Sequence, residues 1–339
     1  MPPTRRRPTI ADVARRAGVS ATAVSFAVND RPGVSPETRE RILAVARELG
    51  WRPSASARAL TEARTRAIGL VLARDLEQLE LDAFFVRFLS GIERTLAPAD
   101  HALLLQIVPA DGSLAAYARL ARGGRVDGCL LTDIEVDDPR FALLEAEGVP
   151  AVLAGRPAGP CPFPWLETRH AEGVDAAVAH LRELGHRRIA FLGGSAEHEH
   201  VRARCARWRA TAGPAAGPEE YATTVPAVPP DASAAARRIL EAGATAVVCT
   251  SDALALPVLR EARSAGLDVP GDVSVVGFDD SPLAALASPA LSSVRVDYAE
   301  FGAAAAAALL ATIAGEPVPG YSASPPELVP RSSTARPRR

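Results

Sequence analysis

The sequence has no lysine, only four cysteines and no long apolar segment. Its cysteines are widely separated and form no C-x-x-C pair, so neither a disulfide framework nor a cysteine metal site is indicated. We expect them to be buried as small hydrophobic residues in a reducing compartment. The longest apolar runs, such as IGLVLA at 68–73, have the length of a strand and fall short of the roughly 20 residues that span a bilayer. No membrane span is predicted.

The first ten residues, MPPTRRRPTI, are basic but lack the apolar core of a signal peptide. A cytoplasmic location is therefore expected. With 339 residues, 48% of them hydrophobic, the chain is long enough for two or three domains with a sizeable core.

Charge is distributed unevenly along the chain. Residues 1–66 carry thirteen arginines and six acidic residues, a net charge of +7, whereas the remainder carries 25 arginines and 34 acidic residues, a net charge of −9. Every basic residue is arginine, which suits bidentate contacts to phosphate and guanine. A small basic module on a larger acidic body predicts that the N-terminal module meets a polyanion.

The stretch TIADVARRAGVSATAVSFAVN at 9–29 predicts two short helices joined by a tight turn. Thr9 can cap the first helix with Asp12 as its reciprocal partner, and this helix ends near Ala17. Gly18 allows the chain to turn, and Ser20 can cap a second helix that runs to about Val28. These are the requirements of a helix-turn-helix whose second helix lies in the major groove of DNA.

A third helix is predicted after Ser35 as its cap, with Pro36 at the first helical position and Gly50 as its stop. Four apolar side chains of this region are expected to complete a three-helix core: Ile42, Leu43, Ala46 and Leu49.

The stretches TIADVARRAGVS, VSFAVNDRPGVSPETRERILAVARELGWRP and ASARAL resemble the head of the lactose/galactose repressor (LacI/GalR) family of bacterial transcription regulators, without gaps over 9–60. The resemblance implies binding of double-stranded, pseudopalindromic DNA. It implies DNA contacts for the residues of the two-helix motif: Thr9, Ser20, Ala21, Thr22, Ser25, Phe26 and Asn29. Many relatives carry a long polar residue at the position of Phe26, which here offers only apolar contact, for example to a thymine methyl.

In the segment WRPSASARAL, Pro53 can begin a helix and residues 54–60 could form barely two turns, which is too short to be stable alone in water. In the family this hinge helix folds on the operator and wedges a leucine into the minor groove. The resemblance assigns that role to Leu60, with Ala57 small enough for close approach and Arg58 near phosphates.

From residue 66, apolar strand-like runs alternate with helical ones, which predicts parallel sheets covered on both faces. About 265 residues of this pattern suit two similar α/β halves, with a ligand cleft at the carboxyl ends of the strands. The predicted fold is a helical head on a two-subdomain α/β body. Its divisions are a head at 1–52, a hinge and linker at 53–66, an effector-binding and dimerisation domain at 67–331, and a disordered tail at 332–339.

The stretches LRELGHRRIAFLGG, VRARCARW, TSDALAL and DVSVVGFDD resemble the core domain of the same regulators and of periplasmic sugar-binding proteins. The resemblance implies a carbohydrate effector, with an arginine and carboxylates matching sugar hydroxyls and aromatic faces covering the ring. Trp165 is a further candidate for such a face. The residues so implicated are Phe84, Phe85, Arg204, Ser251, Asp252 and Asp279.

Some features depart from the family pattern and leave other effectors open. LDAFF replaces an Asn-Pro-Phe-Phe-like run, and LETRHAEG at 166–173 offers Arg169 and His170 where many relatives have Asp-Asn. A nucleobase, an acidic metabolite or no effector remain alternatives to a sugar.

Catalysis and metal binding are not predicted. Gly193-Gly194 lacks the Lys-Ser/Thr of a phosphate loop, and GFDDSP has no nucleophile with a cooperating histidine. His186, His198 and His200 suggest a metal only weakly, because the H-E-H loop lacks a third ligand nearby, and a solvated loop is the favoured interpretation. No cofactor is expected. A sugar-binding protein without a regulatory DNA role is the alternative function, but it would have an export signal and no basic head.

A reader of half-sites needs two-fold symmetry to bind a pseudopalindrome, so a homodimer is expected. The C-terminal PPELVPRSSTARPRR has no leucine heptads that would join dimers into tetramers.

Overall fold

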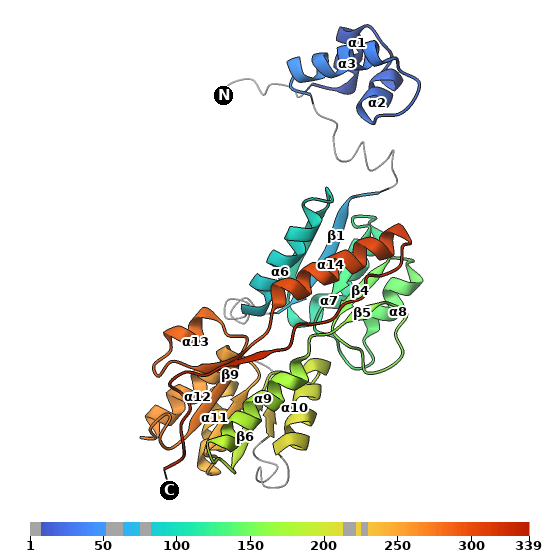
Figure 1. Ribbon diagram of the computed structural model, residues 1–339. Helices are drawn as coiled ribbons and strands as arrows, with labels where there is room; N and C mark the ends of the chain where they lie inside the picture. The colour runs from blue at the N-terminus through green and yellow to red at the C-terminus, as the bar shows by residue number, and fades with distance from the viewer. Residues whose placement is uncertain (1–7, 52–63, 75–82, 213–221, 225–229, 339) are drawn as a thin grey trace, which may run out of the picture. The chain divides into compact units, whose positions relative to one another are not determined.

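The computed structural model describes residues 8–51, 64–74, 83–212, 222–224 and 230–338, and the chain divides into two compact units between Thr65 and Arg66 (Figure 1). In the part of the chain that is described, no helix is long and apolar enough to cross a membrane. The proposed hinge contacts at Ala57, Arg58 and Leu60 lie outside the described residues.

The N-terminal unit contains the three predicted helices, α1 (Ile10–Ala17), α2 (Ala21–Val28) and α3 (Pro36–Glu48). Val13, Val24 and Ile42, one from each helix, are fully buried in its core. The expectation for Leu43 is wrong: its side chain is exposed, because Ile42 and Ala46, four residues apart, form the inward face of α3.

The second unit consists of two α/β lobes. The first lobe has a parallel sheet in the order β2-β1-β3-β4-β5. Its strands are β1 (Ala67–Ala73), β2 (Ala102–Val108), β3 (Gly128–Leu131), β4 (Ala151–Ala154) and β5 (Trp165–Leu166). Its helices are α6 (Ala83–Leu96), α7 (Ser113–Arg122), α8 (Pro139–Ala146) and α14 (Tyr298–Ala314), with a short 3-10 turn η1 (Ala110–Gly112).

Alternate residues of these strands face opposite layers, as the pleat of a strand requires. On β1, Leu70 belongs to the core under α6 and α14, whereas Val71 belongs to the core under α7. Two glycines allow α6 and α14 to cross at close range: a Cβ on Gly91 would lie 2.0 Å from the carbonyl oxygen of Ala299, and a Cβ on Gly302 would lie 2.1 Å from that of Phe88.

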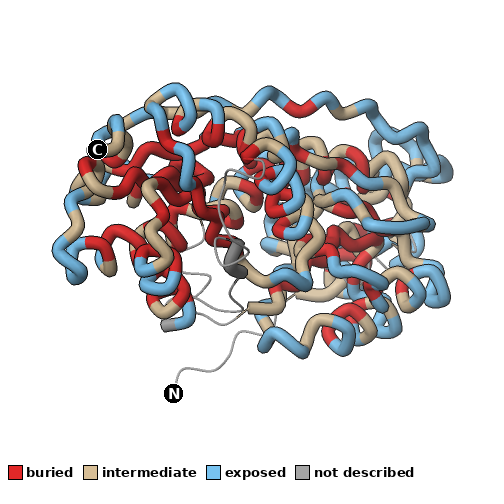
Figure 2. Tube along the Cα trace, turned by 90° about the horizontal axis from the view of Figure 1, so that it is seen from below, coloured by how far each residue is buried: buried red, intermediate tan, exposed pale blue. Residues whose placement is uncertain are grey.

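The second lobe has a six-stranded sheet in the order β11-β10-β9-β8-β6-β7, parallel except for the edge strand β11. Its strands are β6 (Ile189–Gly193), β7 (Ala222–Thr224), β8 (Ala246–Cys249), β9 (Ser274–Phe278), β10 (Ser292–Arg295) and β11 (Glu327–Val329). Its helices are α9 (His170–Glu183), α10 (Glu199–Ala212), α11 (Pro230–Glu241), α12 (Asp252–Ser264) and α13 (Pro282–Leu286). Figure 2 shows buried residues forming the interior of the fold and exposed residues its outer turns.

The lobes are not consecutive pieces of chain. After the second lobe the chain returns to the first as α14 and then comes back to the second as β11. The alternating sequence predicted two α/β halves correctly, but it contains no signal for this return.

The prediction of a disordered tail is wrong for residues 332–338. Ser333 is fully buried; its hydroxyl donates to the carbonyl of Val275 at 2.6 Å and accepts from the backbone N–H of Ser292 at 2.8 Å. The backbone N–H of Arg338 donates to the carbonyl of Gly271. Small side chains let this segment lie against the second lobe although its composition is polar and proline-containing.

Candidate functional site

The helix-turn-helix presents the N-terminal part of α2 to solvent. Ser20 caps α2 by accepting from the backbone N–H of Ala23 at 3.1 Å, and Gly18 has the positive φ of 67° that the turn requires. Val24 is buried in the core, whereas Ala21 and Thr22 are exposed. The predicted recognition face is therefore accessible on a rigid, capped helix.

The other predicted DNA-contact residues are partly engaged within the head. The backbone N–H of Thr9 donates to Asp12 Oδ2 at 2.9 Å, which is the reciprocal bond of the predicted capping box, and the Thr9 hydroxyl donates to the same oxygen at 2.7 Å. Asn29 Nδ2 donates to Ser25 Oγ at 3.4 Å. Phe26 is half-buried, with its ring beside Gly33. Thr9 thus fixes the start of α1, while Ser25 and Phe26 keep partial access to a partner.

The positive charge of the N-terminal unit lies mainly in its flanking segments. Residues 8–51 carry six arginines and five acidic residues, whereas 1–7 carry three arginines and 52–65 carry three with one glutamate. Within the helices, Arg39 donates to the carbonyls of Ala27 and Arg31, and Arg16 pairs with Glu48 at 2.6 Å. These two side chains hold helices and loop together rather than adding to a basic surface.

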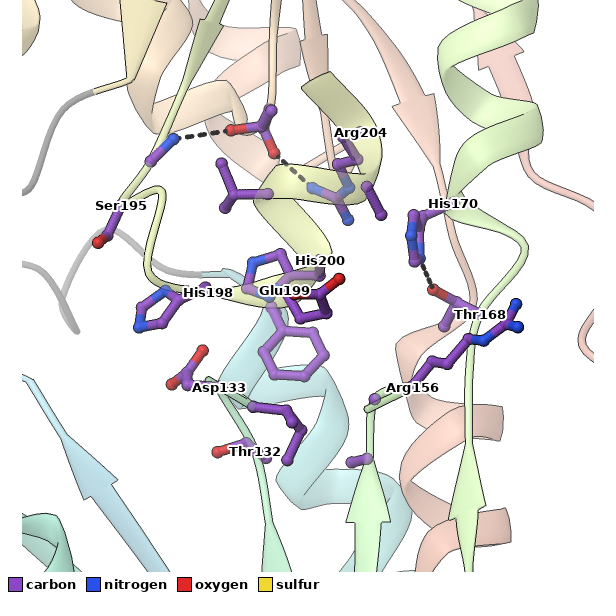
Figure 3. A pocket seen from close by; sticks show the side chains of 18 of the residues that line it. Thr132, Asp133, Arg156, Thr168, His170, Ser195, His198, Glu199, His200 and Arg204 are labelled. Carbon is purple, nitrogen blue, oxygen red and sulfur yellow. Dashed lines mark hydrogen bonds between the residues drawn. The ribbon is translucent and has the colours of Figure 1, made fainter. Parts of the chain in front are cut away.

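A cleft of about 880 Å³ lies between the two lobes of the body. Its lining includes residues at or just beyond the carboxyl ends of parallel strands, as open α/β sheets favour. The first lobe contributes Thr132 and Asp133 after β3 (Figure 3). It also contributes Arg74 after β1, and the second lobe contributes Thr250 and Ser251 after β8. This volume accommodates a molecule of the size of a small saccharide.

Arg204, on α10, is held rigidly at the cleft. Its Nη1 donates to the carbonyl of Thr250 at 2.9 Å, and its guanidinium carbon lies 4.1 Å from the ring centroid of Phe278. Its Nε is buried, and among the described residues nothing accepts a hydrogen bond from it. A buried donor of this kind favours a ligand that brings an oxygen acceptor.

Asp279 and Phe84 also line the cleft. Asp279 Oδ1 accepts from the hydroxyl of Tyr298 at 2.7 Å, and burial together with Asp279 raises the pKa of Tyr298 well above its ordinary value, so the phenol stays protonated. The ring of Phe84 packs edge-on against Tyr298. A carboxylate, a phenol and an aromatic face thus meet at one wall of the cleft.

Two predicted effector residues do not line the cleft. Phe85 is almost fully buried in the core of the first lobe. Asp252 is equally buried, and it accepts hydrogen bonds from the backbone N–H of Ser281 and the hydroxyl of Ser293, both at 2.6 Å. Ser251 does line the cleft, and it caps α12 by accepting from the backbone N–H of Leu254. Trp165, the aromatic alternative, is not among the lining residues.

Sequence analysis missed a cluster formed by Asp133, His198 and His200. One ligand-type atom of each lies within 4.8 Å of the others, so the statement that the histidines lack a third partner is wrong. Arg74 donates to both carboxylate oxygens of Asp133, at 2.6 and 3.2 Å. Since 65 residues separate Asp133 from His198, only the fold shows that they are neighbours.

The cleft keeps its buried histidines uncharged. Burial, reinforced by Arg204, lowers the pKa of His170 to about 3 and that of His200 well below its ordinary value. Burial would raise the pKa of Asp133, but its ion pair with Arg74 holds it below its ordinary value. At neutral pH the cleft therefore contains neutral imidazoles and an ionised carboxylate.

Each of the two units contains a segment that matches a known family. Residues 9–54 match the family described as bacterial regulatory proteins, lacI family, and residues 178–334 match the periplasmic binding protein-like domain. The HTH-type transcriptional regulator reg1 of Streptomyces lividans is 34% identical over 96% of each chain, and CelR of Thermobifida fusca is 35% identical over 92% of this chain and 94% of its own.

Solved structures are similar to nearly the whole chain. The lac repressor dimer bound to operator and the anti-inducer ONPF has a TM-score of 0.83 at 27% identity, covering 97% of this chain and 100% of its own. A transcriptional regulator CelR-cellobiose complex has a TM-score of 0.73 at 30% identity, covering 96% and 100%. A helix-turn-helix head followed by a periplasmic-binding-protein-like domain defines a class of transcription regulators. Within that class, the chain belongs to the lacI family of bacterial regulatory proteins.

Proposed function

We propose that the protein is a cytoplasmic homodimeric repressor that binds a pseudopalindromic operator and releases or tightens its hold when a carbohydrate enters the cleft. The observation that carries this proposal is the combination, in one chain, of an accessible recognition helix with a two-lobed cleft that presents the buried donor of Arg204.

Support for the DNA partner comes from the head. Its second helix is capped by Ser20, exposes Ala21 and Thr22, and has the arrangement that reads base edges in the major groove. The arginines on both sides of the helices supply charge for phosphate contacts. The hinge residues Ala57, Arg58 and Leu60 would add a minor-groove contact. A relative of known structure, the lac repressor dimer, is bound to its operator.

Support for a carbohydrate comes from the cleft chemistry. Arg204 Nε can donate to a hydroxyl oxygen, the carboxylate of Asp279 and the phenol of Tyr298 lie at the same cleft, and Phe84 offers an aromatic face. Sugars are bound by such combinations of charged hydrogen-bonding groups and apolar ring contacts. The related CelR was solved with cellobiose.

Support for a dimer comes from apolar side chains on the surface of the first lobe. Ile107 on edge strand β2 is 50% exposed and Val86 on the adjoining α6 is 70% exposed. An operator with two half-sites requires two heads related by a two-fold axis. A ligand that binds one closure state of the cleft better than another would shift the spacing of the heads and hence their affinity for DNA.

The first test is recovery and sequencing of genomic DNA fragments bound by the purified protein at about 150 mM salt, where non-specific binding is weak. A shared pseudopalindrome is expected. If neither the protein alone nor the protein with a panel of sugars and purines enriches such a motif, the repressor proposal is wrong.

The effector role is tested with Arg204→Gln, with Arg202→Gln as a matched control on the exposed side of the same helix. Loss of a hydrogen bond from a charged group costs about 1.5–3 kcal/mol, so effector affinity should fall roughly tenfold to a hundredfold. Titration calorimetry with cellobiose and other mono- and disaccharides measures it, and operator affinity without effector should stay unchanged. If both variants bind the sugar with equal affinity, Arg204 does not take part in effector binding.

A further inference from the structure

The cleft also contains a cluster that carbohydrate recognition does not require. Asp133 follows β3 of the first lobe, whereas His198 and His200 flank the start of α10 in the second lobe (Figure 3). Their ligand atoms lie within 4.8 Å of one another. We propose that these three side chains bind one divalent transition-metal ion, such as Zn²⁺, and so join the two lobes across the cleft. This proposal goes beyond the proposed function and does not depend on it.

Backbone contacts fix the two halves of the cluster next to each other. The N–H of Glu199 donates to the carbonyl of Ile134 at 2.8 Å, and Glu135 pairs with His198 in an isolated antiparallel bridge. The histidine loop of the second lobe is therefore attached to the residues that directly follow Asp133. The short distance between this loop and Asp133 is therefore set by the backbone and does not depend on the rotamers of long side chains.

The ligand set suits a transition metal. Two imidazoles and a carboxylate are common ligands of Zn²⁺, with bonds of about 2.0–2.2 Å, whereas Mg²⁺ and Ca²⁺ prefer oxygen ligands. Ligand atoms around such an ion lie about 3–3.5 Å apart. The ligand atoms of Asp133, His198 and His200 now lie within 4.8 Å of one another. Side-chain rotations that move each of these atoms by about 1 Å would bring them to the spacing found around such an ion.

The surroundings of the cluster resemble those of a metal site. Arg74 donates to both oxygens of Asp133 and thereby orients the carboxylate, while each oxygen has a second lone pair for an ion. Glu199, between the two histidines, has a buried Oε2 that accepts no hydrogen bond from the described residues, with Arg202 Nε 3.8 Å away. A bound cation would compensate the negative charge of the Glu199 carboxylate, whereas the positive charge of the Arg74 guanidinium would repel the cation. We therefore expect selectivity for ions that bind imidazole strongly.

The test uses the full-length protein without a histidine tag, stripped with a chelator. Zn²⁺ is titrated against a chromophoric competitor, and Co²⁺ is added separately to record its visible absorption, which reports coordination geometry. One equivalent of Zn²⁺ per chain is expected, and Mg²⁺ at the same concentrations should not compete.

Variants assign the ligands. His198→Gln and His200→Gln should each weaken Zn²⁺ binding at least about tenfold and reduce the Co²⁺ absorption. The control His101→Gln removes a histidine outside the cluster and should bind as the original chain does. Asp133→Asn should act like the histidine variants; if loss of the Arg74 pair prevents its folding, the two histidine variants decide.

The proposal is overturned if the original chain binds no Zn²⁺ saturably, or if both histidine variants bind it undiminished. When chelator is added to the operator and effector experiments, their outcomes are independent of this metal proposal.

Discussion

At the scale of single residues, Asp252 has a structural role in the fold, although the family resemblance implies a role in ligand binding. Both of its carboxylate oxygens are used inside the second lobe, by the backbone N–H of Ser281 and the hydroxyl of Ser293. A Cβ at Gly277 would lie 2.2 Å from Asp252 Oδ1, so glycine is required on β9 where the carboxylate rests. Asp252 thus joins the start of α12 to β10 and to the residue that precedes α13.

We predict that Asp252→Ala lowers the free energy of unfolding by about 1–3 kcal/mol, because it leaves the buried N–H of Ser281 without an acceptor. Urea unfolding measures this loss. Ser251→Ala, the comparison variant, removes only the helix cap and should cost about 1 kcal/mol. If Asp252→Ala instead unfolds like the original chain and loses sugar binding, the ligand role implied by the family resemblance is correct.

Some cleft residues could be predicted from the sequence, whereas others could not because they are brought together only by the fold. Arg204 and Asp279 were found because they occur within family motifs that also set the local fold. Asp133 has no such motif, and its importance depends on a contact with His198 that only the docking of two lobes creates. Asp252 was misplaced because an aspartate after a strand can point into a cleft or into the protein.

At the scale of elements, the C-terminal segment is an integral part of the second lobe. The backbone N–H of Val275 donates to the carbonyl of Ser333 at 2.9 Å, and the carbonyl of Ala335 accepts from His186 Nε2 at 2.9 Å. Arg338 pairs with Asp268 at 2.6 Å.

We predict that ending the chain at Arg331 lowers the free energy of unfolding by about 3 kcal/mol or more, because the buried N–H groups of Val275 and Ser292 lose their acceptors. Thermal unfolding of the truncated chain compared with the full chain of 339 residues measures the effect. If both chains have the same midpoint of thermal unfolding, the segment does not stabilise the second lobe, and the original prediction of a disordered tail is correct.

Elements with strong periodicity were predicted well, whereas those defined by tertiary contact were not. β1, with five consecutive buried residues, is recognisable as a strand covered on both faces. β5 and β11 have two and three residues, so their sequences carry no period, and they exist because neighbouring strands offer backbone partners. The position of α14 on the first lobe depends on Gly91 and Gly302, which the sequence presents as isolated glycines.

At the scale of the whole molecule, the histidines determine how stability responds to mild acid. Burial lowers the pKa of His170, His180, His186 and His200 in the folded state. The unfolded chain, with a histidine pKa of about 6.5, therefore binds more protons below that pH. The stability that these neutral histidines provide is fully present above about pH 6.5 and is lost as the pH falls towards their folded-state values.

We predict that the free energy of unfolding in the presence of chelator decreases from pH 7.5 to pH 5.5, with a limiting slope of about 1.4 kcal/mol per pH unit for each of His170 and His200, whose folded-state pKa values lie well below the unfolded value. A variant with His170→Gln and His200→Gln should show a shallower slope, because two of the groups are removed. Urea unfolding at three pH values within this window isolates histidines from carboxylates, which titrate lower. A rise in stability on acidification would contradict the prediction.

The return of α14 to the first lobe also governs the order in which a growing chain can fold. Phe301, Ala305 and Leu309 belong to the same buried cluster as Leu70 and Phe88. While the ribosome is still translating residues 100 to 300, the apolar faces of β1 and α6 lack this cover, whereas the head has the side chains of its core once residue 51 has emerged. The helix-turn-helix can therefore fold early in synthesis, but the ligand cleft cannot exist until translation is nearly complete.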